Sequence, residues 1–159
     1  MSTALKVVEN ANAAVTKEGE FVTMRVAGQL FGIDVMRVQD VLRGLKVTRI
    51  PLAPKEVAGT MNLRGRIVTA INVRQCLDLG PYTGTPVPKE RIMSVVVEHR
   101  HEFFSLIVEA IGEVINLPLA QIEKSPANLS GKWKEVASGV YKMENELLVI
   151  IDIERLLKF

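Results

Sequence analysis

Few side chains in this sequence could carry out catalysis. The two histidines, His99 and His101, stand in a polar segment that is expected to be a turn, and no third metal ligand is spaced nearby. The one cysteine, Cys76, falls on an apolar stripe, where a small buried side chain is expected rather than an exposed nucleophile. The sequence has no glycine-rich phosphate loop with its lysine. It therefore predicts no catalytic residue, no metal and no cofactor, and indicates a protein that works by binding.

The best candidate for a recognition residue is an arginine at the tip of an expected hairpin. Asn62 and Gly65 frame a tight turn, and glycine can adopt the positive φ that the reversal needs. The apolar run over 67–73 is too short to span a membrane and is expected to be a strand buried on both faces. Arg64 would then be presented on a rigid tip, although an arginine in a turn is more often an ordinary solvated side chain.

The composition favours a β-rich domain in a reducing compartment. Of 159 residues, 48% are apolar but only 5% are aromatic, so the core must consist mainly of Val, Ile and Leu, which favour strands. The net charge of +2 comes from interspersed acidic and basic residues, which argues against a basic surface that binds nucleic acid. A single cysteine cannot form an internal disulfide, and neither a signal peptide nor a membrane span is evident. We therefore expect a cytoplasmic protein.

The order of expected elements starts with a flexible tail over residues 1–20. A strand containing Phe31, Ile33 and Val35 follows, and then a short helix, because Val38, Val41 and Leu42 recur at helical spacing. Residues 80–90 are rich in proline and glycine and are expected to be a linker.

A repeat divides the chain into two similar halves. Phe31, Val38 and Asp40 match Phe104, Ile111 and Glu113 at an offset of 73 residues. Gly59, Leu63 and Val73 match Gly139, Met143 and Ile153 at an offset of 80. We interpret the halves as two copies of one unit with about five strands. The expected divisions are a first barrel at about 21–79, a linker at about 80–90, a second barrel at about 91–152 and a terminal helix at 153–159.

Three motifs resemble the CheW family of bacterial chemotaxis adaptors. They are Phe31-Gly32-Ile33-Asp34-Val35 with Val38-Gln39-Asp40-Val41, then Val47-Thr48-Arg49-Ile50-Pro51, and above all Asn62-Leu63-Arg64-Gly65-Arg66-Ile67-Val68. The resemblance covers about residues 20–159. The same module occurs in the kinase CheA and in CheV, but neither a kinase nor a receiver domain is recognisable here, which favours the free-standing adaptor.

The resemblance implies a mainly β fold of two pseudo-symmetric five-stranded β-barrels, with short helices and an apolar groove between them. It implies a scaffold that couples chemoreceptors to the CheA histidine kinase without catalysis. The expected partners are the regulatory domain of CheA and the cytoplasmic tip of methyl-accepting chemoreceptors, with no nucleic acid and no direct membrane insertion. The protein would be cytoplasmic and recruited to membrane-associated receptor arrays.

The family's functional positions can be carried over residue by residue. Gly59 matches a position tied to the kinase contact. Asn72 stands where the family usually has Asp, whereas Asp152 keeps the acid in the second half. Val38 and Val114 could equally be core residues, and Asp40 could be an exposed acid without a partner. The receptor-facing positions match Val38, Asp40, Arg64, Ser105, Ile111 and Val114.

The alternative from another class is a small nucleic-acid-binding β-barrel. Scarce aromatics and balanced charge count against it, because single-strand binders stack bases on aromatic side chains in basic grooves. Its contact residues would be Arg25, Arg43, Arg49, Arg64 and Arg66.

Overall fold

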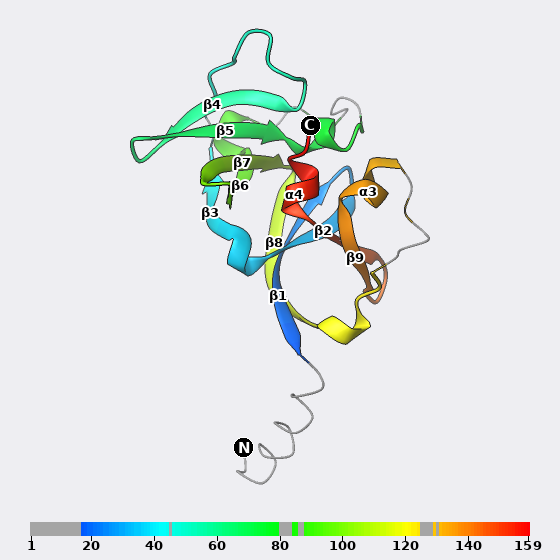
Figure 1. The fold of residues 1–159 in the computed structure, drawn as a ribbon. Coiled ribbons are helices and arrows are strands. Elements are labelled where there is room, and N and C mark those ends of the chain that lie inside the picture. Colours follow the sequence, from blue (N-terminus) through cyan, green and yellow to red (C-terminus); the bar gives the residue numbers. More distant parts are fainter. Residues whose placement is uncertain (1–16, 45, 80–83, 86–87, 125–128, 130) are drawn as a thin grey trace, which may run out of the picture.

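Two five-stranded sheets form the protein in the computed structural model, which describes residues 17–159 except 45, 80–83, 86–87, 125–128 and 130. The expected mainly β fold of two five-stranded units is confirmed, and the sheets lie one above the other in Figure 1. Sheet A has the order β8-β1-β2-β10-β9, and its strands are β1 (Glu18–Val26), β2 (Gln29–Asp34), β8 (Ala110–Pro118), β9 (Ala137–Lys142) and β10 (Leu147–Ile151). Sheet B has the order β3-β6-β7-β5-β4, and its strands are β3 (Val38–Arg43), β4 (Val57–Leu63), β5 (Arg66–Asn72), β6 (Met93–His99) and β7 (Glu102–Val108).

The described helices are all short. The α-helices are α2 (Val73–Cys76), α3 (Gly131–Val136) and α4 (Ile153–Leu156), and the 3-10 helices are η1 (Val35–Arg37), η2 (Lys89–Arg91) and η3 (Leu119–Gln121). α2 directly follows β5, and α4 directly follows β10. Both helices contribute buried residues to the core between the sheets.

The sequence repeat is a real structural symmetry. Replacing β1–β5 by β6–β10, and the reverse, turns the strand order of sheet A into that of sheet B. In sequence, the offset of 73 aligns β2 with β7, and the offset of 80 aligns α2 with α4. Equivalent strands therefore have equivalent neighbours in the two sheets.

The boundaries of the two units differ from the expected ones. Sheet B is one continuous stretch, residues 38–108, whereas sheet A combines β1 and β2 with β8–β10 from the far end of the chain. Parallel pairing joins the halves in both sheets, with Phe31 opposite Val149 and Ala70 opposite Ser105. A division at 21–79 and 91–152 therefore does not describe the sheets. A repeat shows which strands are equivalent, but it does not show which copy they pair with.

The ends of the expected elements also need correction. Residues 18–20 were expected in a flexible tail but belong to β1, where Glu18 lies opposite Pro118. The rest of the expected tail, residues 1–16, lies outside the described residues, as does much of the expected linker at 80–90. Where a terminal helix over 153–159 was expected, the structure has the shorter helix α4, which ends at Leu156.

The largest core cluster lies between the two sheets. It contains fully buried residues of both, such as Phe31 of sheet A and Leu106 of sheet B, together with Cys76 of α2 and Leu156 of α4. Trp133 of α3 packs its ring edge-on against Phe31, with 6.0 Å between centroids. Because the core between the sheets is packed, the apolar side chains that can reach solvent are those on the edge strands.

A candidate protein-binding site on one edge of the molecule

The β4–β5 hairpin presents Arg64 at its tip. Arg64 and Gly65 have φ values of 52° and 81°, as a two-residue type I′ turn requires, and Asn62 Oδ1 accepts a 2.9 Å hydrogen bond from the Gly65 N–H. The Arg64 side chain is 78% exposed. A left-handed conformation costs a non-glycine residue about 1–2 kcal/mol, so turn stability alone does not favour arginine here.

Asp40 has an ion-pair partner, Arg64, and the element that carries Asp40 is a strand rather than the expected helix. Arg64 Nη2 lies 3.0 Å from Asp40 Oδ2, and the Asp40 side chain is 26% exposed. Asp40 is in strand β3, and the helical turn before it, η1, ends at Arg37. Asp40 Oδ1 also accepts a 2.8 Å hydrogen bond from the Val41 N–H. The carboxylate is thus fixed from two sides and holds the guanidinium beside the edge of sheet B.

The second arginine of the tip is used differently. The Arg66 guanidinium lies over the Phe103 ring of β7, 4.4 Å from its centroid, which is cation–π geometry. Arg66 therefore braces the hairpin against the sheet, and Arg64 is the arginine at the tip that projects.

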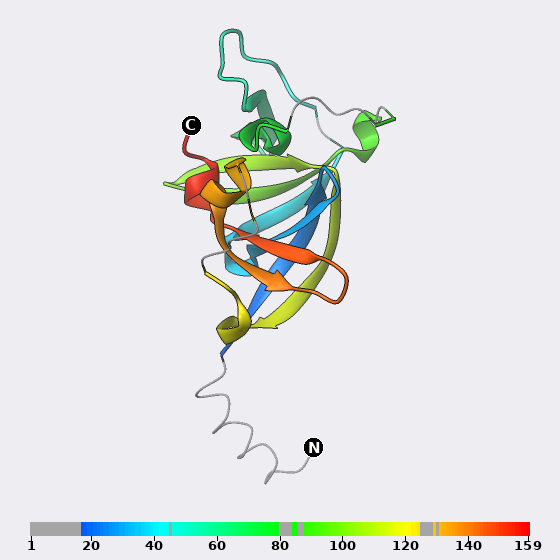
Figure 2. The same cartoon turned by 90° about the vertical axis from the view of Figure 1, so that its right-hand side faces the viewer.

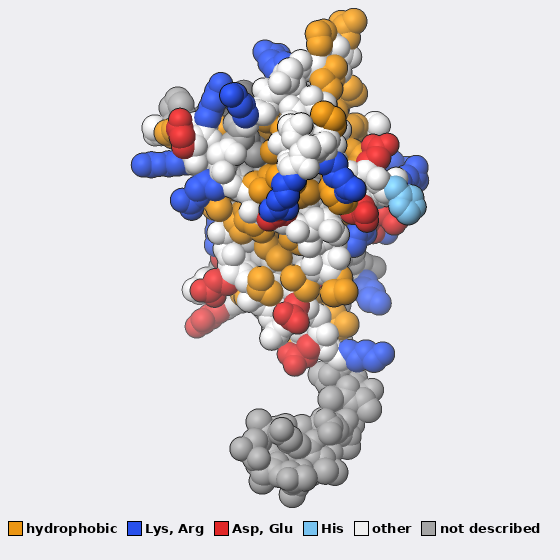
Figure 3. Space-filling model, turned by 90° about the vertical axis from the view of Figure 1, so that its left-hand side faces the viewer, with side chains coloured by type: hydrophobic (Ala, Val, Ile, Leu, Met, Phe, Trp, Pro, Cys, Tyr) orange, Lys and Arg blue, Asp and Glu red, His pale blue; other side chains and the backbone are white. Residues whose placement is uncertain are grey.

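An apolar strip lies along the two edge strands β3 and β8. Val38 is opposite Val97 and Ile111 is opposite Met24, and both partners belong to the core between the sheets. Val114 is 51% exposed and lies opposite Val22 of the same core. Paired strand residues share a face, so these side chains form the open rim of the central core. Figure 3 shows hydrophobic side chains gathered in the middle of this side, below several Lys and Arg side chains.

One member of the strip, Val41, was missed by sequence reasoning. Val41 is 43% exposed and lies opposite Val95 of the central core. It is the equivalent of Val114 at the 73-residue offset, just as Val38 is the equivalent of Ile111. The repeat is the signal that could have found it, but the helical spacing of Val38, Val41 and Leu42 predicts a helix at this position instead.

Ser105 is the site residue whose expected role the structure corrects. It is completely buried in β7 at the centre of sheet B, between Val96 and Ala70. Ser105 therefore cannot touch a partner in this conformation. The sequence of a short strand does not reveal whether both of its faces are covered, and in β7 both are covered at Ser105 and Leu106, which are fully buried.

Gly59 is also buried, and its structural role is explicit. It has a φ of 149°, and a Cβ atom added there would collide with Thr48 O and approach Val47 Cγ1 to 2.7 Å. Thr48 and Thr60 exchange two N–H···O bonds of 2.8 Å, which tie the chain after β3 to β4. The absence of a side chain at Gly59 makes this bridge possible.

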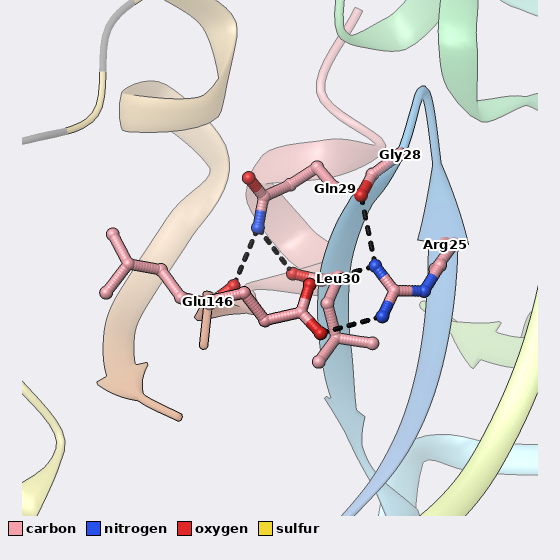
Figure 4. A network of polar contacts seen from close by, with 6 residues as sticks. Arg25, Gly28, Gln29, Leu30 and Glu146 are labelled. Carbon is pink, nitrogen blue, oxygen red and sulfur yellow. Dashed lines mark hydrogen bonds and ion pairs between the residues drawn. The ribbon is translucent and has the colours of Figure 1, made fainter. Parts of the chain in front are cut away.

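Arg25, a contact residue of the nucleic-acid alternative, is engaged within the protein. Its guanidinium donates to both Glu146 carboxylate oxygens at 2.9 and 2.7 Å and to Gly28 O at 3.0 Å (Figure 4). Gln29 Nε2 donates to Leu30 O and Leu147 O, both at 2.8 Å, so the β1–β2 and β9–β10 hairpins are joined. The hydrogen bond from Arg25 lowers the pKa of Glu146, and the same pairing raises the pKa of Arg25.

The groups that could have performed chemistry are placed unfavourably for it. Burial, with a smaller contribution from Glu56, raises the pKa of the Cys76 thiol from 9.0 to about 12. His99 lies against Phe104, with 6.2 Å between ring centroids. Within the described residues, no group of three or more His, Cys, Asp or Glu is arranged to hold a metal ion. No helix in the described part of the chain is both long and apolar enough to cross a membrane.

Known proteins are similar to this chain in sequence and in fold. The sequence model of the CheW-like domain matches residues 20–159. The chain is 28% identical over 145 residues to the chemotaxis protein CheW of Bacillus subtilis, covering 91% of this chain and 90% of that protein. It is 27% identical over 137 residues to CheW of Treponema pallidum, covering 86% and 81%. The crystal structure of the scaffolding protein TtCheW from Thermoanaerobacter tengcongensis matches with a TM-score of 0.77 and 26% identity, covering 89% of this chain and 93% of that chain. The chain therefore belongs to the CheW-like family of chemotaxis scaffold proteins.

Proposed function

We propose that this protein is an adaptor that couples chemoreceptors to a CheA-type histidine kinase by binding both, without catalysis. The observation that carries the proposal is the apolar rim next to the Asp40–Arg64 pair, in which Val41 and Val114 are exposed and Val38 and Ile111 are partly buried. Its partners would be the cytoplasmic tip of a methyl-accepting receptor and the regulatory domain of the kinase. The protein would work in the cytoplasm, at receptor arrays.

The strip and the arginine have complementary tasks in receptor binding. The four apolar side chains stand at the edge of a packed core, so they can be covered by a helical receptor tip without rearrangement of the sheets. Arg64 can offer a receptor carboxylate or carbonyl a fixed, charged donor, which sets the orientation of the contact. Ser105 does not belong to this set, because it is buried.

Gly59 would affect kinase binding indirectly. It is buried, so its part in a kinase contact is to keep the bridge between Thr48 and Thr60 closed. The chain that leaves this bridge reaches the surface and is available to a second partner.

A reconstituted mixture tests the proposed function. Purified kinase, a receptor cytoplasmic fragment on vesicles and this protein are combined, and kinase autophosphorylation is followed with and without the protein. Bridging raises the effective concentration of kinase at the receptors, so receptor-dependent activity should collapse without the protein. Receptor-dependent activity that is equal in both mixtures would refute the adaptor function.

A further inference from the structure

A cavity of about 240 Å³ lies beside α2 and η2, where the parallel strands β5 and β7 of sheet B end. Its apolar lining comes from two clusters. Val26 and Val108 belong to the core between the sheets, whereas Ile92 and Ile107 pack against a separate buried cluster of sheet B. Figure 2 faces the side on which α2 lies, and Figure 3 faces the opposite side, which carries the apolar strip. The cavity is therefore separate from the proposed receptor surface.

The rim of the cavity carries two arginines and one glutamate. Arg74 Nη1 pairs with Glu109 Oε2 at 2.7 Å, and the same carboxylate oxygen accepts a 3.1 Å hydrogen bond from the Ala27 N–H. The charge of Glu109 is thus matched within the protein. Arg91 is exposed, and it has no ion-pair partner among the residues that the structure describes. The mouth of the cavity therefore has a net positive charge next to an apolar floor.

The equivalent end of sheet A has the opposite character. There the positions of Ile107, Asn72 and Arg74 are occupied by three acids that also line a cavity, Asp34, Asp152 and Glu154. Asp34 and Asp152 accept hydrogen bonds from N–H groups of η1 and α4, so they serve as helix caps. Asn72 makes no such bond at α2. Sheet B thus has an apolar wall and a basic rim where sheet A has acidic residues, and the shared fold does not require this difference.

We propose that this cavity binds a small monocarboxylate with a branched apolar body, held by Arg91 and Asn72. The volume is below the roughly 300–1,000 Å³ of sites for drug-sized ligands, so the apolar body consists of only a few carbon atoms. A guanidinium binds a carboxylate through two parallel N–H···O bonds, and the Asn72 amide adds a further donor. A phosphate dianion fits less well, because Glu109 lies on the same rim and would repel it. The site adds a small-molecule ligand to a protein whose proposed function concerns protein partners.

The test follows the backbone amide signals of the isotopically labelled full-length protein by NMR while isocaproate is added. Saturable shifts are expected at Asn72, Ile92 and Val108, which line the cavity. Isocaproamide has the same apolar body without the charge and should bind at least about fivefold more weakly. Acetate has the charge without the apolar body and should bind at least about tenfold more weakly.

Three variants and one control locate the site. Arg91→Gln should weaken isocaproate binding at least about fivefold, whereas Arg91→Lys keeps the charge and should weaken it only about twofold. Asn72→Asp places the acid of sheet A beside the ligand carboxylate and should weaken binding about tenfold without lowering the melting temperature. Arg100→Gln is the matched control, because Arg100 is an exposed arginine in the β6–β7 turn, at the other end of these strands. It should not change the affinity.

Three results would overturn the inference. The first is the absence of saturable shifts at Asn72, Ile92 and Val108 with the wild type. The second is equal affinity for isocaproate and isocaproamide, because the charged rim would then have no part in binding. The third is an equal loss in Arg100→Gln and Arg91→Gln, which would show a general attraction of the anion to a basic surface. None of these results bears on the adaptor function, which is tested with the receptor and the kinase.

Discussion

Sheet A and sheet B have one architecture but different surfaces. Their strand orders are equivalent, and each has a β-bulge between its outer pair, at Val22/Met24 and at Val38/Asp40. Each also has a glycine beside a closing bridge, Gly59 at Thr48–Thr60 and Gly139 at Glu123–Val140. Features repeated in both sheets are therefore those that the fold itself requires.

The rims of the two sheets carry different charges. The ion pair of Asp40 and Arg64 in sheet B corresponds to Glu113 and Glu144 in sheet A, which are both acidic. The repeat thus separates two kinds of residue without an alignment of relatives. Residues equal in both sheets maintain the fold, and residues that differ, such as Arg64, are free to serve binding.

The largest effect is expected at the two bridging glycines. Gly59→Ala places a Cβ atom against the Thr48 carbonyl oxygen, so the bridge must open, at a cost of about 2–4 kcal/mol. This lowers the melting temperature by roughly 4–16 °C at about 2–4 °C per kcal/mol. Gly139→Ala should be destabilising too, because its Cβ would lie 2.6 Å from Ile122 Cγ2 and 2.9 Å from Glu123 O. Gly65→Ala is the control, with a positive φ but no atom within 4 Å, and should cost only about 1 kcal/mol. If Gly139→Ala melts like the wild type, the equivalence of the two bridges is disproved.

The next largest effect concerns Arg64 and receptor affinity. Arg64→Glu should weaken receptor binding at least tenfold, since a charged hydrogen bond contributes about 1.5–3 kcal/mol. The melting temperature should barely change, because an exposed ion pair contributes only about 0–1 kcal/mol. Adding Asp40→Arg should restore part of the affinity. The matched control is Glu144→Arg at the equivalent tip of sheet A, which should leave receptor affinity unchanged. Unfolding of Arg64→Glu would instead identify the arginine as a structural residue.

A smaller effect is expected for the strip. Val41→Ser and Val114→Ser should each weaken receptor binding by about fivefold, because each removes about 1 kcal/mol of apolar burial. Both residues are roughly half exposed, so melting temperatures should fall by only a few degrees. Equal losses would show that the receptor covers both edge strands, whereas an effect at Val114 alone would exclude β3 from the apolar contact.

A smaller effect, on stability, is expected from a substitution that makes the N-terminal caps of α2 and α4 alike. Asp152 caps α4 by accepting from the Glu154 and Arg155 N–H groups, whereas Asn72 makes no side-chain cap bond at α2. Asn72→Asp should therefore stabilise the protein by about 0.3–1 kcal/mol, or roughly 1–4 °C in melting temperature. The reciprocal Asp152→Asn should lower it. No gain from Asn72→Asp would mean that the two helix ends are not equivalent.

The smallest effect is the pH dependence of the Arg25–Glu146 pair in sheet A. Because pairing lowers the folded-state pKa of Glu146, its contribution is present above the ordinary carboxyl pKa and is lost as the pH falls below it. Both side chains are partly exposed, so the effect should be slight and should shrink with added salt. The melting temperatures of the wild type and Glu146→Gln should be measured between about pH 3 and pH 7, roughly the range in which carboxylates titrate. They should converge at the acidic end of this range. Melts that stay equally far apart at every pH would contradict this linkage.

Much of the fold was predictable because the repeat appears in the sequence. The matched apolar positions and the glycine pair Gly59 and Gly139 predicted two equivalent units, and the turn residues Asn62 and Gly65 predicted the hairpin that presents Arg64. The exchange of strands between the halves was not predictable, because pairing across the halves leaves no local pattern in the chain.

The wrongly expected helix has a physical cause in the β-bulge. An extra residue in β3 breaks the alternation, so Val38 and Val41 face the same side three residues apart, which imitates helical spacing. The same bulge places Ile111 and Val114 three residues apart on β8. The depth of Ser105 was unpredictable for another reason, because its burial depends on its position at the centre of sheet B, among strands distant from it in the sequence.

The interrupted course of sheet A has a consequence for how the chain folds during synthesis. All strands of sheet B are available once residue 108 has left the ribosome, whereas β2 must wait for Val149 before its parallel partner exists. Contacts between residues distant in the sequence form slowly, because the entropy cost of closing a long loop comes before the contacts can stabilise the chain. The first hairpin therefore spends much of translation with one edge unpaired, and such edges promote aggregation. A nascent chain stalled after β7 should contain an ordered sheet B and a β1–β2 hairpin that is still accessible to chaperones.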